Sequence, residues 1–287
     1  MRRRALALSF AVLLALAGCG EPARDWPAPS PALWEVTGPA GQHGWLFGTI
    51  HSLPEGARWH TRAVDQALAQ SKVLVVEIAN LNDTAAAKAA FQRLATTPGL
   101  PPLSQRVRQQ DRPALAAFLE QAGMRDDAFP DTETWAATLQ IANAARRRAP
   151  VTGVDRELIA KAKRVVGLET FASQYRVFDA LPPEEQVDLL MSEAVDSDGK
   201  EADKRVADWL TGNLRALERD SAAGVLGDPE LRRALQTTRN EAWIDPIVGL
   251  LSAHQRPFVA VGEAHMFGDE SLPELLRARG YTVKRVQ

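Results

Sequence analysis

Two histidines that lie far apart in the chain share the same local frame. His51 follows Gly48 by three residues, and His265 follows Gly262 by three residues, so each stands in a Gly-x-x-His motif. An apolar stretch typical of a buried strand precedes each glycine. A lone histidine after a strand is usually a structural hydrogen-bonding residue, but the repeated frame favours chemistry. Imidazole transfers protons near neutral pH and binds transition metals, so the pair predicts a metal site or an acid–base site.

Two glutamates also stand at the ends of apolar stretches. Glu77 closes the clearest buried strand, residues 72–78, and Glu169 lies near the end of residues 165–170. A carboxylate at the end of a buried strand is costly unless it is paired, hydrated or bound to a cation. Open α/β sheets place their ligands at such strand ends. These glutamates are therefore candidates for the same site as the histidines, although a structural pairing with a helix terminus is the alternative.

Strand and helix patterns alternate along the chain. This alternation predicts an α/β fold with a central mixed β-sheet, flanking helices and a large helical insertion. A hairpin is expected from residues 33–37 and 44–49, and the insertion begins with residues 83–148. Further strands are expected at residues 72–78, 165–170, 258–261 and 281–286, and further helices at residues 61–71, 156–164, 181–217, 229–251 and 270–279. Asp155 is a candidate N-cap of the helix that follows it.

The first 31 residues carry signals for export. Three arginines, a short apolar run and the sequence Leu-Ala-Gly-Cys19 resemble a bacterial lipoprotein signal, in which the cysteine is lipidated. An ordinary cleaved signal with an incidental cysteine is the alternative. We expect a signal peptide at residues 1–18, a proline-rich tether at 19–31 and one α/β domain at 32–287. Gly20 is not the aspartate associated with inner-membrane retention, so we expect a lipid anchor on the periplasmic face of the outer membrane.

Composition excludes several classes of function. The chain has 34 basic and 36 acidic residues, and removal of residues 1–18 takes away three arginines. The resulting negative charge gives no electrostatic basis for binding nucleic acid. Cys19 is the single cysteine, so no internal disulfide is expected. The sequence lacks a His-Glu-x-x-His zinc motif, a phosphate-binding loop, a dinucleotide fingerprint and a nucleophile elbow.

The order of these motifs resembles the TraB/GumN family over roughly residues 34–286. The resemblance rests on residues 46–54, Val76-Glu77, Gly153-Val154-Asp155, Gly167 to Thr170 with Gln174, Arg239-Asn240 with Trp243, and residues 261–265 with the Leu-Leu-Arg-x-x-Gly-Tyr-x-Val that follows. In the second histidine frame the family more often has Gly-x-Gly-His, where this chain has Glu263 and Ala264. The resemblance implies a fold related to Tiki proteases, erythromycin esterases and the haem-binding ChaN lipoproteins.

The resemblance also implies roles for individual residues. His51, His265 and Glu77 match the positions proposed to hold a divalent metal ion, such as Mn, Co, Zn or Fe, in Tiki-like members. Two imidazoles and a carboxylate leave a coordination position open for water, whose pKa a divalent cation lowers to about 7. Arg239 is then a candidate for stabilising the oxyanion. Glu169, Asn240, Asp155 and Glu263 are secondary candidates, Glu263 as a further ligand or a solvent-facing carboxylate.

The sequence leaves several functions open. The leading hypothesis is a lipid-anchored envelope hydrolase, a metal-dependent peptidase acting on a peptide or on a small ester or amide. A metal-free esterase is an alternative, with His51 as a general base oriented by Glu77, and with His265 and Arg239 polarising the substrate. A non-catalytic lipoprotein that binds haem, and a helper protein with purely structural histidines, are the remaining readings. Each assigns a different role to the same few residues.

Overall fold

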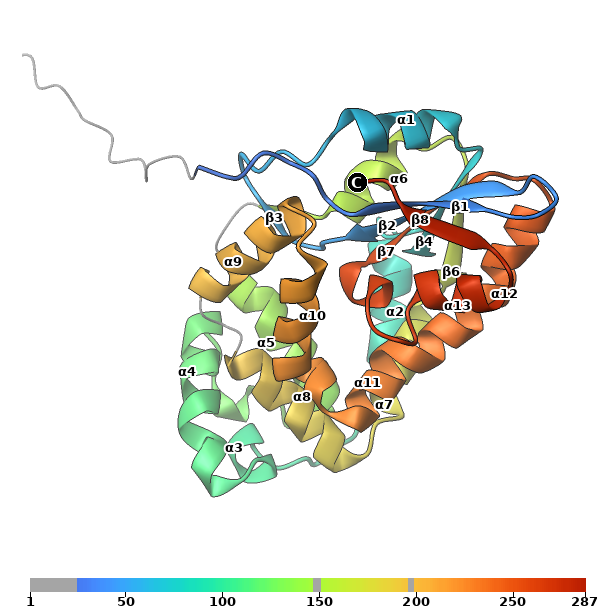
Figure 1. Cartoon of the computed structure of the whole chain (residues 1–287). Helices are drawn as coiled ribbons and strands as arrows, with labels where there is room; N and C mark the ends of the chain where they lie inside the picture. Colours follow the sequence, from blue (N-terminus) through green and yellow to red (C-terminus); the bar gives the residue numbers. More distant parts are fainter. Residues whose placement is uncertain (1–24, 147–150, 196–198) are drawn as a thin grey trace, which may run out of the picture.

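The computed structural model describes residues 25–146, 151–195 and 199–287 (Figure 1). The predicted signal peptide, Cys19 and the first part of the predicted tether lie outside the described residues. Residues 25–31 of that tether run against the domain. Trp26 packs on a core cluster, and the Ser30 N–H donates to the Leu210 carbonyl at 2.6 Å. No helix within the described ranges combines the length and the apolarity that crossing a bilayer requires.

A six-stranded sheet lies at the centre of the fold, with the strand order β6-β4-β7-β2-β1-β8. The strands are β1 (Leu33–Thr37), β2 (His43–Thr49), β4 (Val73–Ile78), β6 (Val165–Glu169), β7 (Pro257–Gly262) and β8 (Thr282–Arg285). β6, β4, β7 and β2 run parallel, whereas β1 pairs antiparallel with both β2 and β8. The predicted mixed α/β sheet and its N-terminal hairpin are therefore confirmed.

The register brings the carboxyl ends of the four parallel strands to one edge. Thr49 pairs with Gly262 across β2 and β7, and Ile78 pairs with Glu169 across β4 and β6. Each of these strand ends carries, or immediately precedes, one of the side chains that the sequence singles out. The sheet alone thus gathers residues that are more than 200 positions apart in the sequence.

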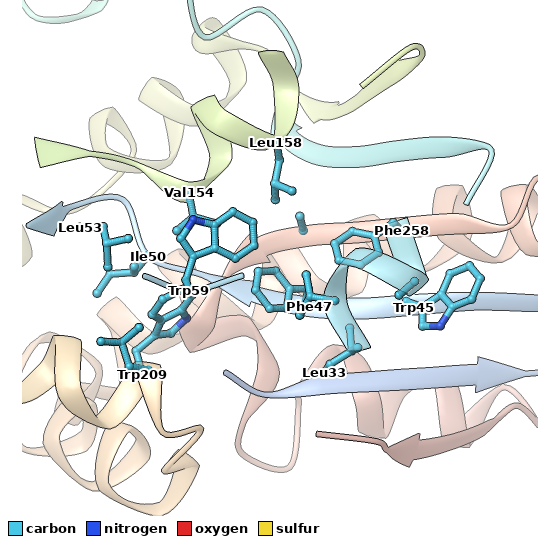
Figure 2. Close-up of a cluster of buried hydrophobic side chains, with 14 of the residues drawn as sticks. Leu33, Trp45, Phe47, Ile50, Leu53, Trp59, Val154, Leu158, Trp209 and Phe258 are labelled. Atoms are coloured by element: carbon cyan, nitrogen blue, oxygen red, sulfur yellow. The ribbon is translucent and has the colours of Figure 1, made fainter. Parts of the chain in front are cut away.

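Both faces of the sheet are covered, which explains why its strands are apolar without alternation. Trp45, Phe47 and Phe258 point into one core cluster, where they meet Trp59 and Trp209 (Figure 2). Their neighbours in the same strands, Leu46, Val259 and Val261, point to the opposite face of the sheet. There they form a second cluster with Trp243, Ile247 and Leu272 from the covering helices. Period-two side-chain alternation therefore fills two cores at once.

Helices cover the sheet and build a separate layer. α1 (Arg62–Gln70) and α6 (Val154–Lys161) contribute Val64 and Leu158 to the first cluster, while α12 (Thr238–Ser252) and α13 (Leu272–Ala278) contribute to the second. The predicted insertion at residues 83–148 contains α2 (Thr84–Leu94), α3 (Leu103–Arg106), α4 (Arg112–Ala122) and α5 (Thr134–Arg146). The helices that follow β6 are α7 (Phe171–Asp179), α8 (Pro183–Val195), α9 (Gly199–Leu210), α10 (Leu214–Ala223) and α11 (Pro229–Arg232).

Some local predictions differ from the structure. Asp155 is not the N-cap of its helix, because α6 begins at Val154 after Gly153, and the Asp155 side chain points into the protein. After His51 the chain forms a short strand that the sequence does not predict, β3 (Leu53–Pro54), which pairs with β5 (Val151–Thr152). The single helix expected over residues 229–251 is divided by a π-turn at residues 233–237. Each difference depends on contacts between distant segments, which local patterns do not encode.

Candidate active site

Glu77, His51 and His265 surround the backbone of Gly262 at the strand ends. The Gly262 N–H donates to Glu77 Oε1 at 2.9 Å. A Cβ atom at Gly262 would lie 3.3 Å from Glu77 Oε1 and 3.8 Å from both His51 Nε2 and His265 Cδ2. The structure therefore brings together the three residues predicted as metal ligands. Glycine suits this position because any side chain would enter the space that they share.

Arg239 from α12 links two of the strand ends. Its guanidinium donates to Glu77 Oε2 at 2.6 Å and to both oxygens of Glu169 at 2.8 and 2.9 Å. The remaining N–H groups face the Leu235 carbonyl at 3.1 Å and His265 Nε2 at 3.3 Å. The three charged side chains are 9–12% exposed. Every Arg239 donor is engaged, so an oxyanion role for Arg239 would require breaking one of these bonds.

His51 is held from its Nδ1 side by Asp155. Its Nδ1 lies 2.9 Å from Asp155 Oδ2, and Thr49 donates to Asp155 Oδ1 at 2.6 Å. Gly153 makes this arrangement possible, because a Cβ atom there would lie 2.8 Å from the His51 carbonyl oxygen. The His51 side chain is 71% exposed, whereas that of Asp155 is 8% exposed. His51 therefore presents Nε2 to an accessible space while a buried carboxylate fixes its ring.

His265 is held in the same manner by a neutral partner. Its Nδ1 lies 2.7 Å from Asn240 Oδ1, and the Asn240 amide nitrogen donates to the Glu270 carbonyl at 2.8 Å. That second bond fixes the orientation of the amide, so its oxygen accepts the Nδ1–H of His265. The His265 ring also packs on Trp243, with 4.5 Å between the ring centroids. His265 is 4% exposed and keeps Nε2 as its acceptor nitrogen.

The surroundings separate the protonation states of these groups. Burial lowers the pKa of His265 to about 3, and the charges of Arg239 and His51 act in the same direction. Burial alone would raise the pKa of Glu77, but Arg239 and then the two histidines lower it to about 2.

The pKa of His51 is shifted upward, opposite to the shift of His265. The surrounding protein would lower the pKa of His51, but the hydrogen bond and charge of Asp155, with Glu77 and Glu263, raise it to about 9. The high solvent exposure of the ring weakens the opposing desolvation, which supports the upward direction. Near neutral pH the metal-free site therefore contains an ionised Glu77, a neutral His265 and a protonated His51.

The donor chemistry fits a divalent cation. Both histidines have Nδ1 bonded to an oxygen acceptor, which is the usual outer-sphere arrangement of metal-ligating imidazoles. Glu77 adds an ionised carboxylate oxygen beside them. The three ligand atoms do not all come within 4.8 Å of one another in the described chain. A cation held by all three would also compete with the Arg239 N–H at His265 Nε2.

The secondary candidates have different places. Asp155 and Asn240 orient the two histidines, and Glu169 anchors Arg239. Glu263 is buried, and its Oε1 accepts two bonds from Arg205 of α9 at 2.7 and 3.0 Å, so it is not a solvent-facing carboxylate.

Two residues that bind side chains of the site were not predicted from the sequence. Thr49 and Arg205 lack a recognisable local motif, although Thr49 lies inside the first Gly-x-x-His frame. Gln174, one of the residues on which the family resemblance rests, donates to Glu77 Oε2 at 3.1 Å.

In the metal-free protein we expect the strand-end site to contribute most to the stability near pH 6.5. Protonated His51 has a raised pKa, so its contribution is complete below pH 6.5 and is lost as pH rises toward 9. Neutral His265 has a depressed pKa, so stability falls as pH drops from 6.5 toward 3, by up to about 1.4 kcal/mol per pH unit. The Glu77 contribution is lost between pH 4.5 and 2. Urea unfolding in chelator measures the free energy of unfolding at each pH, and the wild type should lose stability relative to His265→Gln as pH falls from 6.5 to 4.5. A stability difference between the two proteins that stays constant over this range would contradict the assignment.

Comparison with known proteins places the chain in a family. Two relatives match it, the uncharacterized protein YbaP of Shigella flexneri and that of Escherichia coli strain K12. Each is 26% identical over 274 residues, which cover 88% of this chain and 92% of the relative. No solved structure gives a significant match. The family model described as TraB/PrgY/gumN matches residues 32–285, so the chain belongs to the TraB/PrgY/gumN family.

Proposed function

We propose that the chain is a hydrolase that uses a divalent metal ion and cleaves an amide bond in a peptide. One observation carries this proposal. Asp155 and Asn240 bind the Nδ1 atoms of His51 and His265, which leaves the His51 Nε2 atom and the Cδ2 side of the His265 ring around Gly262 with Glu77. The peptide substrate follows from the resemblance to Tiki-like proteases, and that more distant kinship stays a prediction.

The charge distribution supports a bound cation. Four carboxylates and two guanidinium groups lie in and next to the site, namely Glu77, Glu169, Asp155, Glu263, Arg239 and Arg205. This excess of negative charge favours binding of a positive charge between His51, His265 and Glu77. In the metal-free protein a proton on His51 supplies part of it, and a divalent cation would replace that proton. Metal binding should therefore release a proton near neutral pH.

The roles of the protein groups follow from their geometry. When bound, a divalent cation polarises a carbonyl oxygen and acidifies water. His51, His265 and Glu77 would hold it. Arg239 keeps Glu77 ionised and fixed in place, so it acts as a positioning residue. Asp155 orients His51, the accessible member of the site, so the substrate must approach on the His51 side.

A metal-free esterase is the second candidate, and the position of Arg239 favours it. Its N–H lies 3.3 Å from His265 Nε2, where it occupies a nitrogen that a metal ion would need. In this reading the protonated His51 stabilises charge developing on the substrate oxygen, and Glu77 contributes only electrostatically. The two candidates differ in whether metal content and activity are lost together.

We also propose that the protein is attached to the bacterial envelope through lipidated Cys19, on the periplasmic face of the outer membrane. The signal pattern at residues 16–19 supports this proposal. Cells expressing the protein with labelled palmitate should yield a labelled band in the membrane fraction. Cys19→Ser should remove the label and release the protein from the membrane. A wild-type protein that takes up no label would refute lipidation.

Metal analysis tests the catalytic proposal first. The purified, untagged protein should contain about one equivalent of Mn, Co, Zn or Fe per chain after incubation with each cation, and should cleave members of a peptide library. His51→Ala/His265→Ala should lose both properties while circular dichroism stays unchanged. His60→Ala is the matched control, because His60 binds Asp65 and Glu157 outside the site. Absence of metal from the wild type under all conditions would exclude the metal-dependent mechanism and direct the work to ester substrates.

Asp155→Asn tests the orientation of His51. The amide cannot supply the negative charge that raises the His51 pKa, so the pH at which the metal-free imidazole titrates should fall. Metal affinity or activity should drop about 10–100-fold, as for other partners of metal-binding histidines. Imidazole NMR titration and metal-dependent turnover measure the two effects. If His51 in this variant titrates at the same pH as in the wild type and activity stays full, Asp155 does not have the positioning role.

A further inference from the structure

Three carboxylates meet in the helical layer, apart from the strand-end site. Glu185 and Asp188 lie three residues apart on α8, and Asp228 precedes α11 (Figure 1). Each offers one oxygen atom, and the three oxygens all lie within 4.8 Å of one another. Like charges at this separation repel, so a proton or a cation must accompany them.

Glu185 is the member that makes this cluster unusual. It is only 7% exposed, and its Oε2 is buried without a hydrogen-bond partner. A buried carboxylate oxygen lacking any donor is costly, and most such oxygens in proteins are paired. One oxygen of Glu185 lies within 4.8 Å of the oxygens of Asp188 and Asp228. Within the described part of the chain, Glu185 is thus a buried acceptor that forms no ion pair with a cationic side chain.

The neighbouring charges do not supply that group. Arg108 pairs only loosely with the cluster, because its Nη2 lies 3.6 Å from Asp188 Oδ1 and its side chain is 63% exposed. Asp228 Oδ1 accepts the backbone N–H groups of Glu230 and Leu231 at 2.7 and 3.0 Å. These bonds fix Asp228 but do not neutralise the carboxylate of Glu185. Glu230 adds another negative charge nearby.

A hollow beside the cluster gives access to it. Its volume is about 310 Å³, and Asp188, Asp228, Ser192 and the backbone around Gly224 contribute to its walls. This space is large enough for a hydrated ion. Glu185 does not line the hollow, but one of its oxygens lies within 4.8 Å of the oxygens of Asp188 and Asp228, which do. A cation that enters the hollow therefore reaches Asp188 and Asp228 directly, with the Glu185 carboxylate beside them.

We propose that Glu185, Asp188 and Asp228 form a second metal site, which binds a hard divalent cation such as Ca²⁺. The ligand set contains only carboxylate oxygens, which suit Ca²⁺ or Mg²⁺ rather than the transition metals expected at imidazole nitrogens. Ca²⁺ accepts irregular oxygen geometry and completes its shell with water, for which the hollow has room. The site stabilises the contact between α8 and α11 and takes no part in the hydrolysis.

The electrostatics agree with this geometry. Burial raises the pKa of Glu185 to about 7, and the charges of Asp228, Glu230 and Asp188 act in the same direction. A proton is therefore the competing occupant, and a cation must displace it. The test has to distinguish the two occupants.

Calcium binding to the full chain tests the proposal. Equilibrium dialysis of the metal-free protein against CaCl₂, and separately MgCl₂, should show one saturable site, and Ca²⁺ should raise Tm by a few degrees. Glu185→Gln and Asp188→Asn should weaken this binding at least about tenfold, because affinity follows the number of charged ligands. Without cation, Glu185→Gln should be at least as stable as the wild type, since it removes a repelling charge. The matched control is Glu184→Gln, an exposed neighbour on the same helix, which should bind as the wild type does.

A variant of the strand-end site tests whether the two proposed metal sites are independent. His51→Ala/His265→Ala should keep the Ca²⁺ site, so failure of the hydrolase proposal leaves this one intact. Two results would overturn the second site: no saturable uptake at Ca²⁺ concentrations up to about 10 mM, beyond the weakest natural sites, or equal uptake by the wild type and Glu185→Gln. Either result would leave a shared proton as the only occupant.

Discussion

The ion pair network of Arg239 is the interaction on which the strand-end site depends. The parallel pairing of β4 and β6 places Glu77 and Glu169 side by side at one edge of the sheet. Two buried carboxylates in that position would be strongly destabilising without a counter-charge. The planar guanidinium bridges both and has no spare donor, so it neutralises them and fixes their oxygens. The sheet register, the position of α12 and the ionisation of Glu77 are thereby coupled.

The same helix also fixes the buried histidine. Asn240 follows Arg239 directly and accepts from His265, while Trp243, three residues after Asn240, packs on the His265 ring. One helix therefore sets the carboxylates and one imidazole. The other imidazole, on His51, depends on a different group of residues, Thr49 and Asp155, and is open to solvent. The site thus has a rigid buried half and an accessible half, and solvent reaches it on the His51 side.

Sequence patterns predicted the strands because apolar runs are local signals, and they placed His51, His265 and Glu77 at or just after the ends of those strands. Apolar runs mark the parallel strands, and the strand order gathers their ends. Asp155 shows where such signals fail: its position ahead of a helical pattern suggested an N-cap, but a buried hydrogen bond to Thr49 determines its place. Arg205 approaches Glu263 from a helix 58 positions away, and only the tertiary fold reveals such a contact. The tight approach of Gly153 to His51 was likewise invisible in the sequence.

Two acidic groups in this protein meet the same electrostatic requirement in different ways. At the strand ends, Arg239 lies within hydrogen-bonding distance of two carboxylates, and the ionised state of Glu77 is stabilised. Between α8 and α11, the exposed Arg108 reaches only the rim of the cluster, and the pKa of Glu185 rises instead. Opposite shifts from similar carboxylates follow from the presence or absence of a fixed counter-charge. The first arrangement supplies its own cation from the chain, whereas the second leaves that place to an ion or a proton from solution.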